Sequence, residues 1–148
     1  MRAFRIVNED WEKVGIEMPT RSTKLSAGYD LSSAIDAVIE PHQYLSLPTG
    51  LKAIMEEDDF LLLVPRSSLA KKHGVRLFNT VGIIDADYAD NPTNGGHIHI
   101  VLYNFTDKPQ TIIKGERIVQ AIFLKYQKTD DDNSINEREG GFGSTGTK

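Results

Sequence analysis

The sequence predicts an all-β protein, a jelly-roll-like distorted barrel of many short strands with one short helix and a mobile C-terminal arm. Most apolar segments are short and rich in β-branched or aromatic residues, which is typical of strands. Turn residues separate these segments at close intervals. Many short strands at such spacing favour a closed all-β architecture.

Nine segments are expected to form strands. In chain order they are Arg2–Val7, Ala37–Glu40, Tyr44–Leu47, Leu51–Met55, Phe60–Val64, Val75–Phe78, Ile98–Asn104, Gln110–Ile113 and Arg117–Tyr126. The turn signals between them are Pro41-His42, Pro48-Thr49-Gly50, Glu57-Asp58-Asp59, Asp107-Lys108-Pro109 and Lys114-Gly115-Glu116.

One helix is expected between the strands. Ser67 or Ser68 could cap its N-terminus, and Gly74 would end it after His73. From about Thr129 the chain is polar, which indicates a segment that is mobile in the free protein. The sequence thus predicts a single β domain over residues 1–128 and a flexible arm over residues 129–148.

The 148 residues suffice for one domain with a real core. A net charge of −4 argues against a sequence-independent grip on nucleic acid, although a few converging cations could still bind an anionic ligand. No window approaches the ~18 apolar residues of a membrane span, and the N-terminus lacks the pattern of a signal peptide. Without cysteine there is no disulfide or thiolate metal site, and a cytoplasmic location is the simplest expectation.

The last nine residues, Gly140 to Lys148, are rich in glycine and small hydroxyl residues. Such a backbone can curl so that successive N–H groups face an anion. The segment fails the Walker A pattern because Thr147 separates Gly146 from Lys148. A disordered tail is the alternative. Phe142 favours a binding arm, since a flexible linker does not need an aromatic ring.

Two further segments are small and polar, unlike the strands around them. The first, Ser26-Ala27-Gly28-Tyr29-Asp30-Leu31, places a flexible glycine beside a carboxylate, although such a segment is most often just a turn. The second, Pro65-Arg66-Ser67-Ser68-Leu69-Ala70, opens the expected helix. Backbone N–H groups, a hydroxyl and a guanidinium could bind a phosphate there. The alternative is a plain helix cap with a surface arginine.

A third polar segment, Asn79 to Tyr88, contains a candidate general base. Asp85 follows Ile83 and Ile84, a pair that should be buried, so its carboxylate would emerge at the edge of the core. Burial raises a carboxyl pKa and a nearby cation lowers it, which is the tuning that a general base needs. The alternative is a tight turn with Asp85 as its first residue.

Other candidate sites are weaker. His97 and His99 lie at strand spacing and could bind a metal, but no third ligand is evident and an exposed strand pair is favoured. The acidic runs at 56–59 and 130–132 are interpreted as solvated turns. Neither Ser67 nor Ser68 lies in a G-x-S-x-G elbow, and no His/Asp spacing supports an acyl-transfer triad.

Taken in order, these segments resemble the five motifs of the trimeric dUTP diphosphatases (dUTPases). The matching segments are Ala27-Gly28-Tyr29-Asp30-Leu31, Pro65-Arg66-Ser67-Ser68-Leu69-Ala70, Asn79 to Tyr88, Gly115-Glu116-Arg117-Ile118-Val119-Gln120 and Gly140 to Gly146. The resemblance implies a jelly-roll-like subunit and a homotrimer whose active sites each draw on three chains. The implied reaction is hydrolysis of dUTP to dUMP and pyrophosphate, with Mg²⁺ held on the triphosphate.

The resemblance also implies roles at the nucleoside end of the substrate. Asp85 matches the carboxylate that orients and deprotonates the attacking water and touches the 3′-hydroxyl. Tyr88 matches the ring under the sugar that leaves no space for a 2′-hydroxyl. The segment that reads uracil corresponds to Asn79 and the backbone around Gly82, Ile83 and Ile84, and Phe142 should stack on the base.

At the phosphate end the implied contacts come from four motifs. Arg66 and Ser67 match groups on the phosphates and the bridging oxygen, and Gln120 matches a supporting contact. Asp30 matches a carboxylate near the water shell of the metal. The distal phosphates would be surrounded by Gly143, Ser144 and Thr145, with Arg138 near the γ-phosphate.

Three features depart from the family pattern. Arg138 lies four residues before Phe142, where five is familiar. Residues 89–96, after Tyr88, form a longer loop of a kind associated with Gram-positive bacteria and their phages. Ser68 stands where glycine is common, which is a modest change, and none of the three departures removes the base.

Two other functions follow from the same resemblance. A dCTP deaminase shares the fold but carries a glutamate in the strand after the third motif, and Ile98–Asn104 has none. Phage members of the family can sequester a repressor, and the loop at 89–96 is a natural surface for a protein partner of that type.

Overall fold

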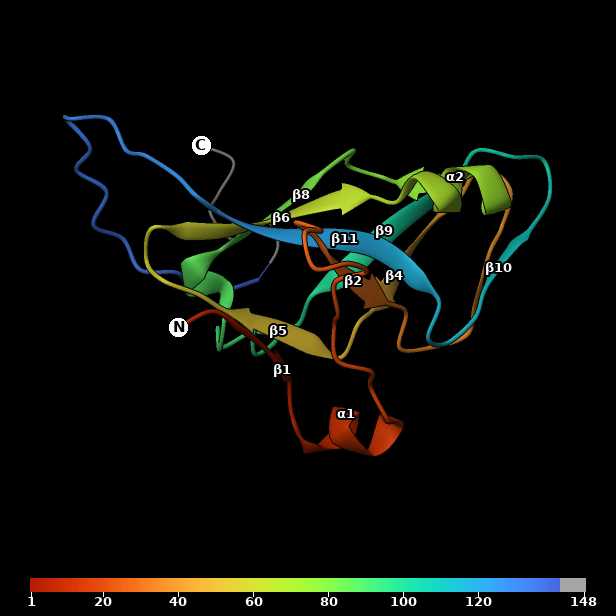
Figure 1. Cartoon of the computed structure of the whole chain (residues 1–148), viewed down its shortest axis with the longest axis horizontal. Coiled ribbons are helices and arrows are strands. Elements are labelled where there is room, and N and C mark those ends of the chain that lie inside the picture. The colour runs from red at the N-terminus through yellow and green to blue at the C-terminus, as the bar shows by residue number, and fades with distance from the viewer. Residues whose placement is uncertain (142–148) are drawn as a thin grey trace.

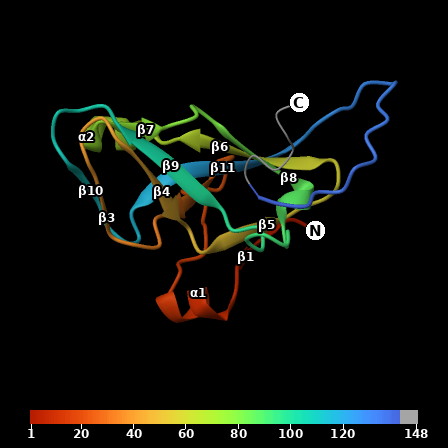
Figure 2. The same cartoon turned by 180° about the vertical axis from the view of Figure 1, so that it is seen from behind.

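The computed structural model describes residues 1–141, and strands dominate it (Figures 1 and 2). Within these residues the strands are β1 (Ala3–Ile6), β2 (Tyr29–Ser32), β3 (Ala37–Ile39), β4 (Tyr44–Pro48), β5 (Leu51–Ile54), β6 (Asp59–Pro65), β7 (Val75–Leu77), β8 (Gly82–Asp85), β9 (His99–Asn104), β10 (Gln110–Ile112) and β11 (Arg117–Lys125). The helical segments are α1 (Glu9–Val14), α2 (Ser67–His73) and a single 3-10 turn, η1 (Ala86–Tyr88). The predicted all-β class is confirmed.

All strand pairs are antiparallel, and the strands form open sheets. One sheet has the order β2-β11-β6-β8 and a second has the order β4-β9-β7. Two smaller sheets pair β1 with β5 and β10 with β3. Within residues 1–141 none of these sheets closes into a barrel.

One hydrophobic core lies between the two larger sheets. Alternate residues of each strand enter it, because successive side chains of a strand point to opposite faces. Leu61 and Leu63 of β6 and Ile100 and Leu102 of β9 are buried in the same cluster. Both β6 and β11 contribute buried side chains to this core, and Arg66 directly follows β6.

The short helix α1 was not expected from the sequence. The Asn8 side chain accepts hydrogen bonds from the backbone N–H groups of Asp10 and Trp11, at 3.1 and 3.2 Å. Gly15 ends the helix with a φ of 76°. None of the six residues is buried, so these local caps define the helix more than packing does.

The acidic run at 56–59 is only partly a solvated turn. Asp59 is fully buried, and Arg2 Nε lies 2.6 Å from its carboxylate. The hydrogen bond from Arg2 holds the pKa of Asp59 below its usual value. Lys125 Nζ lies 2.5 Å from Asp58. These ion pairs connect the N-terminal segment and the end of β11 to the turn at 56–59. The expectation that the whole run is solvated was therefore wrong at Asp59. The run at 130–132 is exposed, as expected.

After β11 the chain continues without helix or strand through residues 129–141. It extends away from the sheets and then returns to the turn after β8, as the blue trace in Figure 1 shows. Within residues 1–141 no helix is long and apolar enough to cross a membrane.

Candidate active site

Three of the five motifs meet at one end of the four-stranded sheet. Because β11 lies between β2 and β6, Gln120 faces Asp30 on one side and Val64 on the other. Arg66 comes directly after β6. Strand pairing therefore brings the carboxylate of the first motif, the guanidinium of the second and the amide of the fourth to one edge.

Asp30 is buried, and its carboxylate contacts three side chains, as an ion pair with Arg66 and as a hydrogen-bond acceptor from Arg117 and Ser22. Arg66 Nε lies 3.1 Å from its Oδ1, and Arg117 Nη1 lies 3.2 Å from its Oδ2. Ser22 Oγ donates to Oδ2 at 3.1 Å. The carboxylate thus fixes two guanidinium groups at this edge. Sequence reasoning missed Arg117 as a member of the cluster, although it lies within the fourth motif.

Gly28 provides space for the Gln120 side chain. A Cβ on Gly28 would lie 2.9 Å from Gln120 Oε1 and 3.2 Å from Gln120 Cβ. Gly28 does not have a positive φ. The sequence interpretation, which invoked backbone flexibility, was therefore wrong in its reason: the glycine permits a close approach.

Helix α2 begins at Ser67, with Arg66 as the N-cap residue at φ −88° and ψ 134°. The prediction that a serine caps this helix was wrong, and no side chain bonds at the cap. Ser67 and Ser68 are exposed in the first turn. The predicted helix end is confirmed, because Gly74 has a φ of 60° and its N–H bonds to Ala70 O.

Glu116 joins the fourth motif to the end of α2. His73 Nε2 lies 2.5 Å and Lys72 Nζ 3.2 Å from its Oε1, and Ile113 N donates to Oε2. Burial alone would raise the pKa of Glu116, but these hydrogen bonds, led by that of His73, hold it below the usual value. The second and fourth motifs are therefore fastened together at both ends of α2.

The third motif forms a turn followed by β8. Thr80 has a φ of 70°, and Val81 N donates to Asn79 O at 2.7 Å. In β8, Ile84 is buried whereas Ile83 is 57% exposed. The expectation that both isoleucines are buried was wrong, because side chains alternate along a strand that has one open face.

Asp85 ends β8, and its side chain is 56% exposed, as predicted for a carboxylate at the edge of the core. Arg138 of the arm forms an ion pair with Asp85, and its Nε lies 2.7 Å from Asp87 Oδ1. The same guanidinium lies over the Tyr88 ring, 5.7 Å from its centroid. The arm therefore returns to the third motif of its own chain.

A hollow of about 650 Å³ opens beside this ion pair. Its lining consists of Met55, Glu57, Asp85, Ala86, Asp87, Tyr126, Ser134 and Arg138. The lining contains three carboxylates and one guanidinium, so the net charge of the hollow is negative and disfavours binding of a triphosphate. Phosphate-binding groups have to come from elsewhere.

The two groups of motif residues lie at opposite ends of β6. Asp85 pairs with Phe60 at the start of β6, whereas Pro65, next to Arg66, ends it beside Val119. Phe60 and Pro65 are five residue steps apart along an extended strand, which is about 17 Å. Figure 1 shows α2 at one end of this sheet and the turn after β8 at the other. One chain does not bring Asp85 to Arg66.

The predicted arm contacts of Phe142, Gly143, Ser144 and Thr145 lie outside the described residues. Arg138 lies within them and contacts the third motif, not the edge formed by Asp30 and Arg66. Its predicted contact with the γ-phosphate stays a prediction.

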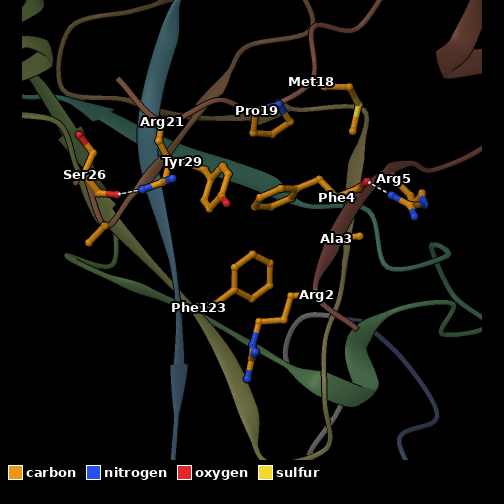
Figure 3. A pocket seen from close by; sticks show the side chains of 11 residues that line it. Arg2, Ala3, Phe4, Arg5, Met18, Pro19, Arg21, Ser26, Tyr29 and Phe123 are labelled. Carbon is orange, nitrogen blue, oxygen red and sulfur yellow. Dashed lines mark hydrogen bonds between the residues drawn. The ribbon is translucent and has the colours of Figure 1, made fainter. Parts of the chain in front are cut away.

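A second hollow, of about 550 Å³, lies between β1 and β2 (Figure 3). Phe4, Tyr29 and Phe123 contact one another there, with ring centroids 5.3–6.3 Å apart. Arg21, at its rim, donates hydrogen bonds to the backbone of Lys24 and Ser26. Ser26, Ala27 and Tyr29 of the first polar segment line it, but none of the residues with a predicted catalytic, substrate-binding or metal role does. We therefore assign the chemistry to the two ends of β6.

The histidine pair is neither exposed nor a metal site. His97 is 6% exposed, and within residues 1–141 no group of three or more His, Cys, Asp and Glu residues could hold a metal. His97 Nε2 accepts a hydrogen bond from Gly50 N at 2.9 Å, so the proton of the neutral His97 ring is on Nδ1. This Nδ1 lies 3.1 Å from His99 Nε2 and donates to it. His99 Nδ1 in turn faces Ser46 Oγ at 3.3 Å. Both rings are therefore held neutral.

Acid should destabilise the protein through this pair. Burial, with a smaller contribution from His99, lowers the pKa of His97 to about 4, and burial also lowers that of His99. As pH falls below the unfolded value of about 6.5, the unfolded chain takes up protons that the folded chain does not bind. We expect His97 alone to account for a loss of about 3 kcal/mol in the free energy of unfolding between pH 6.5 and pH 4.

Urea unfolding at several pH values measures this loss. His97→Asn should flatten the pH dependence, whereas the matched change His42→Asn, at an exposed histidine paired with Asp107, should leave it in place. If the free energy of unfolding of His97→Asn fell with pH as steeply as that of the wild type, the buried histidine pair would not be the origin of the pH dependence.

The chain was then compared with known proteins. The dUTPase family model matches residues 15–146. A deoxyuridine 5′-triphosphate nucleotidohydrolase from Lactococcus lactis is 44% identical over 148 residues, covering 99% of this chain and 98% of its own length. A similar enzyme from Neisseria meningitidis is 34% identical and covers 91% of both.

Solved structures agree with this assignment. A dUTPase from Streptococcus mutans superposes with a TM-score of 0.80 at 38% identity, covering 86% of this chain and 98% of the other. The fold extends to a dUTPase from phage phi11 of S. aureus, described with a structural Mg(II) ion, at a TM-score of 0.71 and 21% identity over 92% of this chain and 97% of that one. The jelly-roll-like fold expected above is the fold of these neighbours. The chain belongs to the dUTPase family, whose members are dUTP diphosphatases.

Proposed function

We propose that the chain hydrolyses dUTP to dUMP and pyrophosphate, with Asp85 as general base, at sites shared between the copies of a homotrimer. Family membership supports the reaction. The observation that carries the shared site is the position of Asp85 and Arg66 at opposite ends of β6.

Hydrolysis of a phosphoanhydride needs an aligned water molecule, a base and positive groups on the departing pyrophosphate. Asp85 is exposed enough to contact water, and the buried Ile84 beside it fixes its backbone. In the free chain the Arg138 guanidinium forms an ion pair with Asp85 and covers the face of the Tyr88 ring. The nucleotide therefore has to displace this guanidinium before Asp85 can accept a proton.

The phosphate end of the site would come from a neighbouring copy. There, Asp30 holds Arg66 and Arg117 in fixed positions, with Ser67 exposed beside them. Two guanidinium groups suit a triphosphate, because they bind phosphate oxygens with charge-assisted hydrogen bonds. A head-to-tail ring of three chains would place this edge against the Asp85 end of the next chain.

The nucleoside end would be read mainly by backbone groups. The turn at Thr80 and the exposed edge of β8 from Gly82 offer N–H and C=O groups to a uracil ring. Such a pocket leaves no room for the 5-methyl group of thymine and pairs poorly with the amino group of cytosine. Tyr88 would lie under the sugar and exclude a 2′-hydroxyl.

Mg²⁺ would enter with the substrate. Asp30 accepts hydrogen bonds from Arg117 and Ser22 and forms an ion pair with Arg66, whereas a carboxylate can accept about four hydrogen bonds. Its remaining capacity to accept fits a water-mediated contact with a metal that the phosphates carry, as is usual for Mg²⁺. The metal would supply positive charge to the phosphates.

The deaminase alternative is not favoured by these findings. Its water-activating glutamate has no counterpart in β9, whose sequence is His99 to Asn104. A repressor-type partner at the loop 89–96 stays a prediction, for which a pull-down with and without the loop is the measurement.

Release of pyrophosphate from dUTP, dCTP, dTTP and UTP tests the proposed function, with ammonia from dCTP followed in parallel. We expect rapid pyrophosphate release from dUTP alone. Ammonia from dCTP without pyrophosphate from dUTP would overturn the proposal. Light scattering should give the mass of three chains.

A further inference from the structure

Tyr88 is fixed by hydrogen bonds at its hydroxyl. The ring is 3% exposed, and its hydroxyl donates to His97 O at 2.9 Å. Asn94 Nδ2 donates to the same hydroxyl at 2.9 Å. Burial raises the pKa of Tyr88, so the phenol keeps the proton that it donates. The hydroxyl is therefore held from two sides.

The orientation of the Asn94 amide follows from its other contacts. Its Oδ1 accepts from Asn91 Nδ2 at 2.8 Å and from Gly96 N at 3.0 Å. An amide whose oxygen accepts from two donors must direct its NH₂ the other way, which here is toward Tyr88. Asn91 is itself buried, and its Oδ1 accepts from the N–H groups of Thr93 and Asn94. The loop 89–96 is thus built around the amide that bonds the tyrosine.

The arm also contacts this amide. A Cβ on Gly141 would lie 3.3 Å from Asn94 Nδ2, so the arm backbone packs directly against it. Arg138, three residues earlier, lies over the Tyr88 ring. Asn94 is therefore placed between the hydroxyl end of Tyr88 and the arm.

We propose that Asn94 is a positioning residue that sets discrimination between dUTP and UTP by fixing Tyr88. The proposal rests on the proposed function, in which the Tyr88 ring lies under the sugar. Steric exclusion of one hydroxyl group depends on a ring that cannot move aside, since a small shift opens the space that the 2′-hydroxyl needs. The loop 89–96 then contributes to specificity without touching the nucleotide.

Two substitutions separate this bond from the rest of the loop. Asn94→Asp keeps the acceptor for Asn91 and Gly96 but removes the donor to Tyr88. Tyr88→Phe keeps the ring but removes its hydroxyl. Each should lower the ratio of kcat/KM for dUTP over UTP about five- to tenfold, the range of a net hydrogen bond. The double variant should be no worse than Tyr88→Phe alone, because Tyr88→Phe already removes the bond that Asn94→Asp breaks, together with the bond to His97 O.

Thr93→Ala is the matched control, since Thr93 is an exposed residue of the same loop. It should keep the wild-type ratio. Three outcomes would overturn the proposal: an unchanged ratio in Asn94→Asp, an equal loss of kcat/KM for both nucleotides, or additive effects in the double variant. Absence of dUTP hydrolysis by the wild-type protein would instead reject the proposed function, so the two failures are distinguishable. Thermal unfolding of each variant checks that it is folded.

Discussion

Replacing Asp85 with asparagine is expected to lower kcat on dUTP by a factor of about 10²–10⁴, the contribution of a general base. Asparagine keeps the shape of the side chain but cannot accept a proton from water. Asp85 is exposed, and within residues 1–141 its ion pair is with Arg138, so the fold should be unaffected. Release of pyrophosphate under saturating dUTP measures the effect, and binding of a non-hydrolysable analogue should be retained.

Asp87→Asn is the matched control for this change. Asp87 contacts the same guanidinium, at 2.7 Å, and is equally exposed, so the control weakens the same ion-pair group. It should keep most of the activity. If Asp85→Asn retained more than about a tenth of the wild-type rate, Asp85 would not be the base. Similar losses in the two variants would assign the effect to Arg138 instead.

A mixture of two inactive variants is expected to recover activity. Arg66→Ala removes the proposed phosphate contact and leaves Asp85 intact, whereas Asp85→Asn removes the proposed base and leaves Arg66 intact. After unfolding and joint refolding, about a quarter of the sites in a symmetric ring should combine an intact base with an intact arginine from the next chain. Activity measured before and after mixing gives the result directly.

Each variant refolded alone serves as the control and should stay inactive. No recovery after joint refolding, with trimers present by light scattering, would place Asp85 and Arg66 of one site on the same chain. That outcome would require β6 to rearrange, because strand pairing separates the two residues in the free chain.

Local patterns predicted much of the fold. The helix that ends at Gly74 and most strands follow from short apolar runs and turn residues. The strands β2 and β8 were not predicted as strands, because each has only four residues, two of them polar or small, and their pairing depends on long-range register. α1 was missed although Asn8 and Gly15 are good capping residues. The six residues between these caps have no apolar face, so the sequence shows no helical periodicity there.

The candidate site was predicted as a set of residue types in order, and its geometry was not. The buried place of Asp30, between Arg66 and Arg117, depends on three strands that are distant in sequence. The role of Asn94 could not be predicted, because one asparagine in a polar loop has no distinguishing pattern. The contact of Arg138 with Asp85 joins residues 53 positions apart.

The length of β6 also determines how activity should depend on the amount of protein. If the base and the phosphate-binding groups stand about 17 Å apart on one chain, a single chain holds only half of a site. The rate in dilute protein should then rise more steeply than the first power of chain concentration, until assembly is complete. A modest fall in expression would reduce hydrolysis more than in proportion.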